Sequence, residues 1–195
     1  MEATAKMTVG SASNSTTKLG PLQNKMQYNR VQELLDDSRS RGYRFALGPH
    51  PAETSKGYLM YPCIVDNPPE DSRIVVEEQF GKKFRQTISL KSKRVPVNTF
   101  LLGIGPIVPV MKYTDESEVI ARANATKTGL AASVWGFDAE RVGRHIEAGS
   151  VFINSFAKMT VRGLFSGQKE SGIGGEWGST GVLAYCNAQV MHVFK

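Results

Sequence analysis

Residues 75–81 read VVEEQFG, and residues 105–110 read GPIVPV. Joined through one shared glycine, the two pieces give VVEEQFGPIVPV, in which two carboxylates and an aromatic residue lead through a turn into an apolar strand. The residues between them, 82–105, separate two halves of what looks like one motif. We call them the basic segment and predict that they are an insertion foreign to the fold.

The basic segment accounts for the whole net charge of +6. It contains six basic residues and no acidic one: Lys82, Lys83, Arg85, Lys91, Lys93 and Arg94. Taking these six from the 24 Lys and Arg leaves 18, which balances the 18 Asp and Glu. Because a nucleic-acid or membrane partner needs a basic face on the fold, we expect neither. Binding through the basic segment alone is an alternative, and it would depend steeply on salt.

Two explanations of the basic segment remain open. It can be a genuine anion-binding loop. It can also be a retained intron, because Gly81-Lys82 can be encoded with the donor-like string GTAAG and Ile104-Gly105 with the acceptor-like TAGG. Removing that span in phase restores Phe-Gly-Pro.

Composition predicts one soluble globular domain. The chain has 195 residues, 41% hydrophobic and 22% charged, which is enough for one core. No apolar run reaches the length of a membrane span, and the N-terminus lacks the apolar centre of a secretory signal. With only Cys63 and Cys186 present, we expect reduced thiols and a cytoplasmic location.

Helix and strand patterns alternate along the chain. Helices are predicted at 24–41, 116–125, 139–148 and 178–185. Strands are predicted at 43–47, 58–65, 107–113, 131–137, 150–154 and 188–194. This alternation predicts an α/β fold, a parallel sheet with helices on both faces.

General catalytic and metal motifs do not fit. The three histidines are scattered without the spacing of metal ligands, so no metal is expected. An S-x-x-K match at 155–158 and a K-T-G match at 127–129 stand in the wrong order and lack S-D-N. A glycine-rich run at 172–178 has Trp177 where a dinucleotide loop needs its third glycine.

Several weaker motifs occur together, in one order, over nearly the whole chain outside the basic segment. They are LGP at 19–21 with NKMQY at 24–28, GY at 57–58 with YP at 61–62, EEQFG at 77–81, GP at 105–106, ANAT at 123–126 with GL at 129–130, SVW at 133–135, EAGSVFIN at 147–154, FSGQK at 165–169 with SGIG at 171–174, and Tyr185. In these motifs the sequence resembles the aldehyde dehydrogenase superfamily.

The resemblance implies that 1–184 form part of the catalytic domain of such an enzyme and that 185–195 begin its oligomerisation strand. The implied reaction converts an aldehyde, NAD(P)+ and water into a carboxylic acid. Homo- or hetero-oligomers through that strand are implied as well.

The resemblance also assigns roles to individual residues. It implies that Gln27 and Arg30 lie near the adenine-side ribose of NAD or NADP. Glu78 would accept hydrogen bonds from the nicotinamide ribose, and Phe80 would pack against the nicotinamide end. Phe165 would line the place where nicotinamide and aldehyde meet. Without the resemblance, a solvated Glu78 and phenylalanines in the core would be the ordinary interpretation.

The family's reaction needs a cysteine thiolate, which attacks the aldehyde, and a glutamate, which activates water. By resemblance, both are expected upstream of Met1. Cys63 and Cys186 lie in apolar, strand-like sequence and do not match the nucleophile motif, so inert thiols are expected. We therefore predict a fragment that is inactive alone. A non-catalytic module that pairs with full-length subunits is the alternative.

Overall fold

A computed structural model describes residues 2–48, 57–77, 86–89, 99–102, 105–156 and 158–194 of the chain. The helices are α1 (Glu2–Ala5), α2 (Lys25–Ser40), α3 (Arg73–Val76), α4 (Glu116–Asn124), α5 (Ala139–Gly143) and α6 (Gly178–Leu183). The strands are β1 (Phe45–Leu47), β2 (Cys63–Asp66), β3 (Gln86–Ser89), β4 (Thr99–Leu102), β5 (Ile107–Lys112), β6 (Thr128–Gly129), β7 (Ala131–Trp135), β8 (Ser150–Ile153), β9 (Phe165–Ser166), β10 (Gln168–Lys169) and β11 (Gly175–Glu176).

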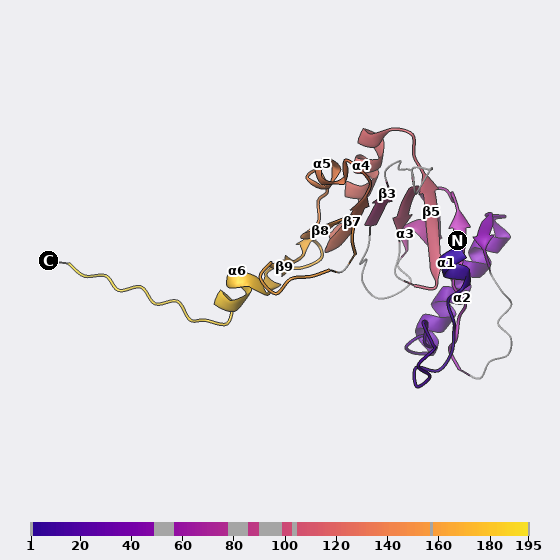
Figure 1. The fold of residues 1–195 in the computed structure, drawn as a ribbon, viewed down its shortest axis with the longest axis horizontal. Helices are drawn as coiled ribbons and strands as arrows, with labels where there is room; N and C mark the ends of the chain where they lie inside the picture. The colour runs from indigo at the N-terminus through magenta and orange to yellow at the C-terminus, as the bar shows by residue number, and fades with distance from the viewer. Residues whose placement is uncertain are drawn as a thin grey trace.

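The main sheet has seven strands in the order β1-β2-β5-β4-β3-β7-β8 (Figure 1). The pairs β2·β5, β3·β7 and β7·β8 are parallel. Strand β1 runs antiparallel at one edge, and β4 runs antiparallel between β3 and β5. The remaining strands form two small sheets, β10·β6 and β11·β9. The predicted α/β class with parallel pairing is confirmed, and β1 and β4 make the sheet mixed.

Part of the basic segment lies in the main sheet, which the sequence did not predict. It contributes β3 and β4, which pair with each other and lie in the middle of the sheet. Charge and composition gave no sign of this, because strand pairing depends on partners far away in the sequence. In β3, Ile88 is only 1% exposed and belongs to a core cluster.

Helix α2 agrees closely with its sequence pattern. The Asn24 side chain caps its first turn by accepting a hydrogen bond from the Gln27 amide at 2.9 Å, as N-cap residues do. The apolar face of the helix is buried, with Leu34 fully covered. Gly42, at φ 69°, follows the helix in the left-handed conformation that glycine adopts readily. Helix α2 covers one of two core clusters, which also contains residues of β2 and β5.

The second core cluster lies around β3, β5, β7, α4 and α5. Helix α4 begins after Asp115, whose carboxylate accepts from the Glu118 amide at 2.8 Å. Helix α5 ends at Gly143, earlier than predicted. Val75, within α3, packs against both clusters and so connects them.

The predicted strand at 188–194 is absent from the described residues. After α6 the chain runs away from the sheet in an extended form (Figure 1). Its apolar side chains are open to solvent, and Phe194 is 92% exposed. The alternating pattern correctly indicated extended backbone, but a strand also needs a partner to supply its hydrogen bonds. No helix in the described parts of the chain is long and apolar enough to cross a membrane.

Candidate functional site

The first turn of α2 carries Gln27, one of the predicted cofactor contacts. Its side-chain carbonyl oxygen, Oε1, is buried and has no hydrogen-bond partner within the described residues. A buried acceptor without a donor costs free energy. This oxygen can accept a hydrogen bond from a hydroxyl or amide donor.

Arg30 lies three residues further along the same helix, with 48% of its side chain exposed. Its Nη2 is 3.7 Å from Oε2 of Glu77, the residue that follows α3. Residues three apart on a helix are neighbours on its surface. Gln27 and Arg30 thus stand together where α2 meets the end of α3.

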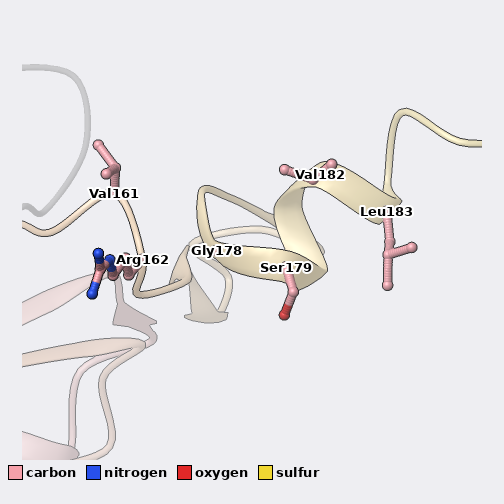
Figure 2. Close-up of a pocket in the computed structure, with 6 residues that line it drawn as sticks. All are labelled: Val161, Arg162, Gly178, Ser179, Val182 and Leu183. Carbon is pink, nitrogen blue, oxygen red and sulfur yellow. The ribbon is translucent and has the colours of Figure 1, made fainter.

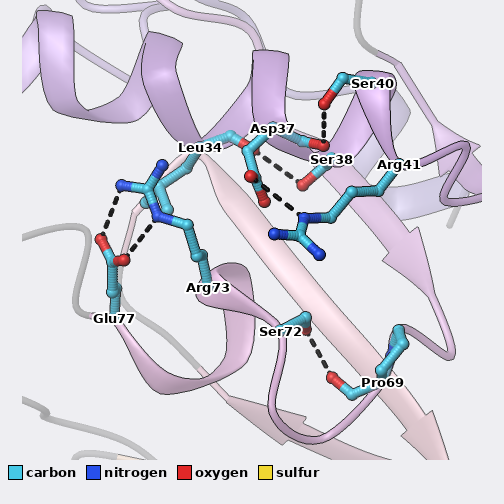
Figure 3. A network of polar contacts seen from close by, with 9 residues as sticks. All are labelled: Leu34, Asp37, Ser38, Ser40, Arg41, Pro69, Ser72, Arg73 and Glu77. Carbon is cyan, nitrogen blue, oxygen red and sulfur yellow. Dashed lines mark hydrogen bonds and ion pairs between the residues drawn. The ribbon is translucent and has the colours of Figure 1, made fainter.

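Glu77 is held in place by a second arginine. Arg73 Nε donates to Glu77 Oε1 at 2.6 Å and Nη2 to Oε2 at 3.1 Å (Figure 3). Hydrogen bonding from Arg73 is the largest cause that lowers the pKa of the Glu77 carboxyl, and the charge of Arg30 adds to it. Since two hydrogen bonds in a fork fix both groups, the backbone around Glu77 is anchored beside α2.

Glu78 and Phe80 lie outside the described residues. Glu78 is bonded directly to the anchored Glu77, so the contact with Arg30 brings α2 to the start of the EEQFG motif. Gln27, Arg30 and the start of this motif are therefore neighbours in space. Their roles toward a cofactor stay predictions.

Phe165 lies elsewhere. It is half-buried on β9, and its ring stacks obliquely on Trp177 with centroids 5.9 Å apart. Figure 1 shows β9 beyond β8 along the long axis of the molecule, while α2 lies near its other end. The structure does not bring Phe165 beside Gln27 and Arg30.

A set of contacts not anticipated from the sequence ties down the loop that carries Phe165. Lys169 Nζ lies 2.6 Å from both the Asn124 carbonyl oxygen and Glu147 Oε2. The Asn124 side chain accepts from the Glu147 amide at 2.9 Å. Three of the motifs found in the sequence, ANAT, EAGSVFIN and FSGQK, therefore meet here. Their common order in the sequence was the only signal that could have indicated these contacts.

An open hollow of about 610 Å³ lies beside this loop. Figure 2 shows its lining residues, which come from α6 and from the turn before β9: Val161, Arg162, Gly178, Ser179, Val182 and Leu183. It is shaped by residues that the sequence analysis did not single out.

The two cysteines differ in environment. Cys63 on β2 is 1% exposed, and burial raises the pKa of its thiol to about 12. Cys186 is exposed, and its Sγ lies 3.6 Å from the Val182 carbonyl oxygen. A nucleophilic cysteine must be a thiolate near neutral pH, and Cys63 is not. No cluster of metal-ligating side chains occurs in the ranges that the structure describes.

The sequence profile of the Aldehyde dehydrogenase family matches residues 1–82 and 103–191. The chain belongs to the aldehyde dehydrogenase family. The profile leaves 83–102 unmatched, a gap that falls within the basic segment. The strands β3 and β4 in the centre of the sheet are therefore not part of the family pattern.

The relatives match almost the whole chain but only part of their own length. "Putative aldehyde dehydrogenase FUS7" of Gibberella moniliformis is 35% identical over 184 residues, which make up 92% of this chain and 34% of that protein. The oxidoreductase from Marinobacter aquaeolei has a TM-score of 0.76 at 32% identity, with 96% of this chain and 35% of that chain covered.

AldC from Pseudomonas syringae, solved with NAD+ and octanal, has a TM-score of 0.74 at 28% identity. The match covers 94% of this chain and 34% of AldC. This aldehyde dehydrogenase chain thus spans about a third of the length of the relatives it matches.

Proposed function

We propose that this chain supplies cofactor and substrate contacts of an NAD(P)-dependent aldehyde dehydrogenase and does not oxidise aldehydes alone. The reaction of the whole enzyme would be aldehyde, NAD(P)+ and water to carboxylic acid. The observation that carries the proposal is the ion pair between Arg30 and Glu77, which holds α2 beside the start of the EEQFG motif. AldC, a relative of similar fold, was solved with NAD+ and octanal.

The residues around this ion pair suit a nucleotide ribose. Oε1 of Gln27, which has no partner among the described residues, can accept a hydrogen bond from a ribose hydroxyl. The half-exposed guanidinium of Arg30 carries several N–H donors. We assign this pair to the adenine-side ribose. Glu78 is assigned to the nicotinamide ribose, because a carboxylate can accept from two hydroxyls at once.

Two aromatic residues complete the assignment. Phe80 would pack on the nicotinamide end, and Phe165 would form part of the substrate wall. When bound, the nicotinamide accepts the hydride released from the substrate. The residues of this chain would orient the cofactor and substrate for that transfer.

The cysteines of this chain support the proposed inactivity. The family reaction begins with a thiolate attack on the aldehyde carbon. Cys63 is buried with a raised pKa. Cys186 is exposed on the segment after α6, outside the core of the domain. Cys63 is therefore not an activated thiolate, and Cys186 does not lie in a protected site.

A chimera tests these assignments. The matching third of AldC is replaced by this chain without 83–102, and oxidation of octanal is followed through NADH formation. We expect activity, a loss of about tenfold or more in kcat/KM for Glu78→Gln, and none for Cys63→Ser. A normal rate for Glu78→Gln, or an inactive Cys63→Ser chimera that is folded by circular dichroism, would refute these roles.

A second candidate function is a non-catalytic module that binds full-length subunits through 188–194. The observation that favours it is the exposed apolar side chains of this segment, including Met191 at 79% and Phe194 at 92%. An extended segment of this kind pairs readily with the edge of another sheet. Co-purification with a full-length relative, lost on removal of 188–194, is expected. A monomer by light scattering at every ratio of the two proteins would contradict it.

We also propose a cytoplasmic location, since both cysteines are free thiols. A fluorescent fusion that enters the secretory pathway would contradict this.

A further inference from the structure

The strands that belong to the family pattern form two separate blocks in the sheet. One block is β1-β2-β5 and the other is β7-β8. In the sheet order β4 and β3 stand between β5 and β7, and both lie in the range that the family profile skips. Since neighbouring strands are about 4.8 Å apart, β5 and β7 are separated by about 14 Å, too far for direct hydrogen bonds.

The relatives share the overall fold of this chain. Their TM-scores are 0.74 to 0.76 over at least 94% of the chain. Those relatives have about two thirds of their length outside the match.

In this chain the hairpin β3–β4 fills the space in regular register. Thr99 and Leu101 of β4 stand opposite Lys112 and Val110 of β5. On the other side, β3 runs parallel to β7, with Ile88 opposite Val134. The facing edges of β5 and β7 are thus both paired with the hairpin.

The hairpin also completes the core. Ile88 is 1% exposed and lies in the same cluster as Met111 of β5 and Val134 of β7. Removing it would leave apolar side chains of both blocks without cover and would expose two strand edges, which favours aggregation.

We propose that the space between β5 and β7 is a docking groove for two strands, which this chain fills with its own hairpin β3–β4. In relatives the same groove would take strands from the part of the polypeptide that this chain does not span. The hairpin therefore pairs the facing edges of β5 and β7 within this chain. Strands from another aldehyde dehydrogenase chain can then no longer pair with these edges.

Cross-linking in the full chain tests the position of the hairpin. Thr99→Cys with Lys112→Cys, in a Cys186→Ser background, places two cysteines at paired positions of β4 and β5. Paired residues are about 5 Å apart at Cα, within the range of a disulfide. We expect the disulfide to form on mild oxidation. The control variant Ser89→Cys/Lys112→Cys should form no disulfide, because β3 and β5 are separated by two strand spacings, or about 10 Å. No bond in the first variant would overturn the proposal.

A variant that lacks residues 83–102 tests the groove itself. Hydrogen exchange of the backbone amides of β5 and β7 is measured in it by mass spectrometry. We expect protection to fall about 100-fold in the deletion variant and to return when a synthetic peptide of residues 83–102 is added. A peptide of the same composition in scrambled order is the control. Unchanged protection in the deletion variant, or equal recovery with both peptides, would overturn the proposal.

Discussion

Arg73 and Glu77 are joined by two hydrogen bonds of 2.6 and 3.1 Å, one helical turn apart, where α3 ends and the EEQFG motif begins. The same carboxylate meets Arg30 of α2 at 3.7 Å. One acidic residue thus connects the two segments that carry the proposed cofactor contacts. Glu77, which anchors the backbone, is therefore directly followed by Glu78, which is proposed to contact the cofactor.

Loss of this carboxylate charge should have a small, pH-dependent effect on stability. Because its pKa is lowered in the folded state, Glu77 stabilises the protein above its unfolded pKa, near 4.3, and this stabilisation is lost as pH falls below it. Glu77→Gln should lower Tm at pH 7 by at most about 3 °C, as for a partly exposed pair. Thermal melts at pH 7 and pH 3 should show the difference from wild type shrinking. A difference that grows toward pH 3 would contradict the pairing.

Gly149 provides a test of the packing that places Phe165. A Cβ at this position would lie 1.7 Å from the backbone oxygen of Ser166, the residue next to Phe165. Gly149→Ala should therefore lower the free energy of unfolding by about 3 kcal/mol, because backbone must move. Gly20→Ala, where nothing lies within 4 Å of the new Cβ, should change it by less than about 1 kcal/mol. Urea denaturation measures both, and equal effects would show that β9 does not approach Gly149.

The two thiols should differ sharply in reactivity. Cys186 is exposed and should react with iodoacetamide at pH 7.5, whereas Cys63 should react more than about 1,000-fold more slowly until the protein unfolds. Mass spectrometry of labelled peptides gives both rates. Equal labelling of the native protein would contradict the burial of β2.

The buried thiol of Cys63 predicts that the protein loses stability at alkaline pH. The pKa of Cys63 is raised from 9.0 to about 12 in the folded state. Between these values the unfolded chain releases the proton first, so the free energy of unfolding should fall as pH rises through this range. Cys63→Ala should remove that part of the fall, and an unchanged pH profile would contradict it.

Helix α2 was predictable because local signals determine it. Asn24, the apolar spacing and Gly42 specify its start, buried face and end within one stretch of sequence. The strands of the basic segment were not predictable, since Ile88 gains its environment from Val134, far along the chain. For the site, motif order led to Gln27 and Arg30, but it gave no sign of the buried side-chain oxygen of Gln27 or of the anchoring of Glu77 by Arg73.

For the segment 188–194, the sequence predicted a strand that is absent from the described residues. Its alternation of apolar and polar residues is a genuine strand signal. A segment with this pattern forms a strand only when another strand pairs with it. The local pattern does not indicate whether that partner strand lies in the same chain.

The retained-intron explanation of the basic segment makes a prediction about the messenger RNA. Some transcripts should join Phe80 to Pro106 through a single glycine codon. Their product would lack β3 and β4, so it should behave like the deletion variant and leave the groove open. Transcript sequencing decides this. Reads that always contain the segment would show that the hairpin is a constant part of the protein.

The claim that this chain carries binding residues of an aldehyde dehydrogenase but no nucleophile is tested most directly by its activity. Purified 1–195 is incubated with octanal and either NAD+ or NADP+, and absorbance at the reduced nicotinamide band is followed, with full-length AldC as the positive control. We predict no change above the blank with either cofactor. Steady production of reduced cofactor that disappears in either Cys63→Ser or Cys186→Ser would contradict the claim.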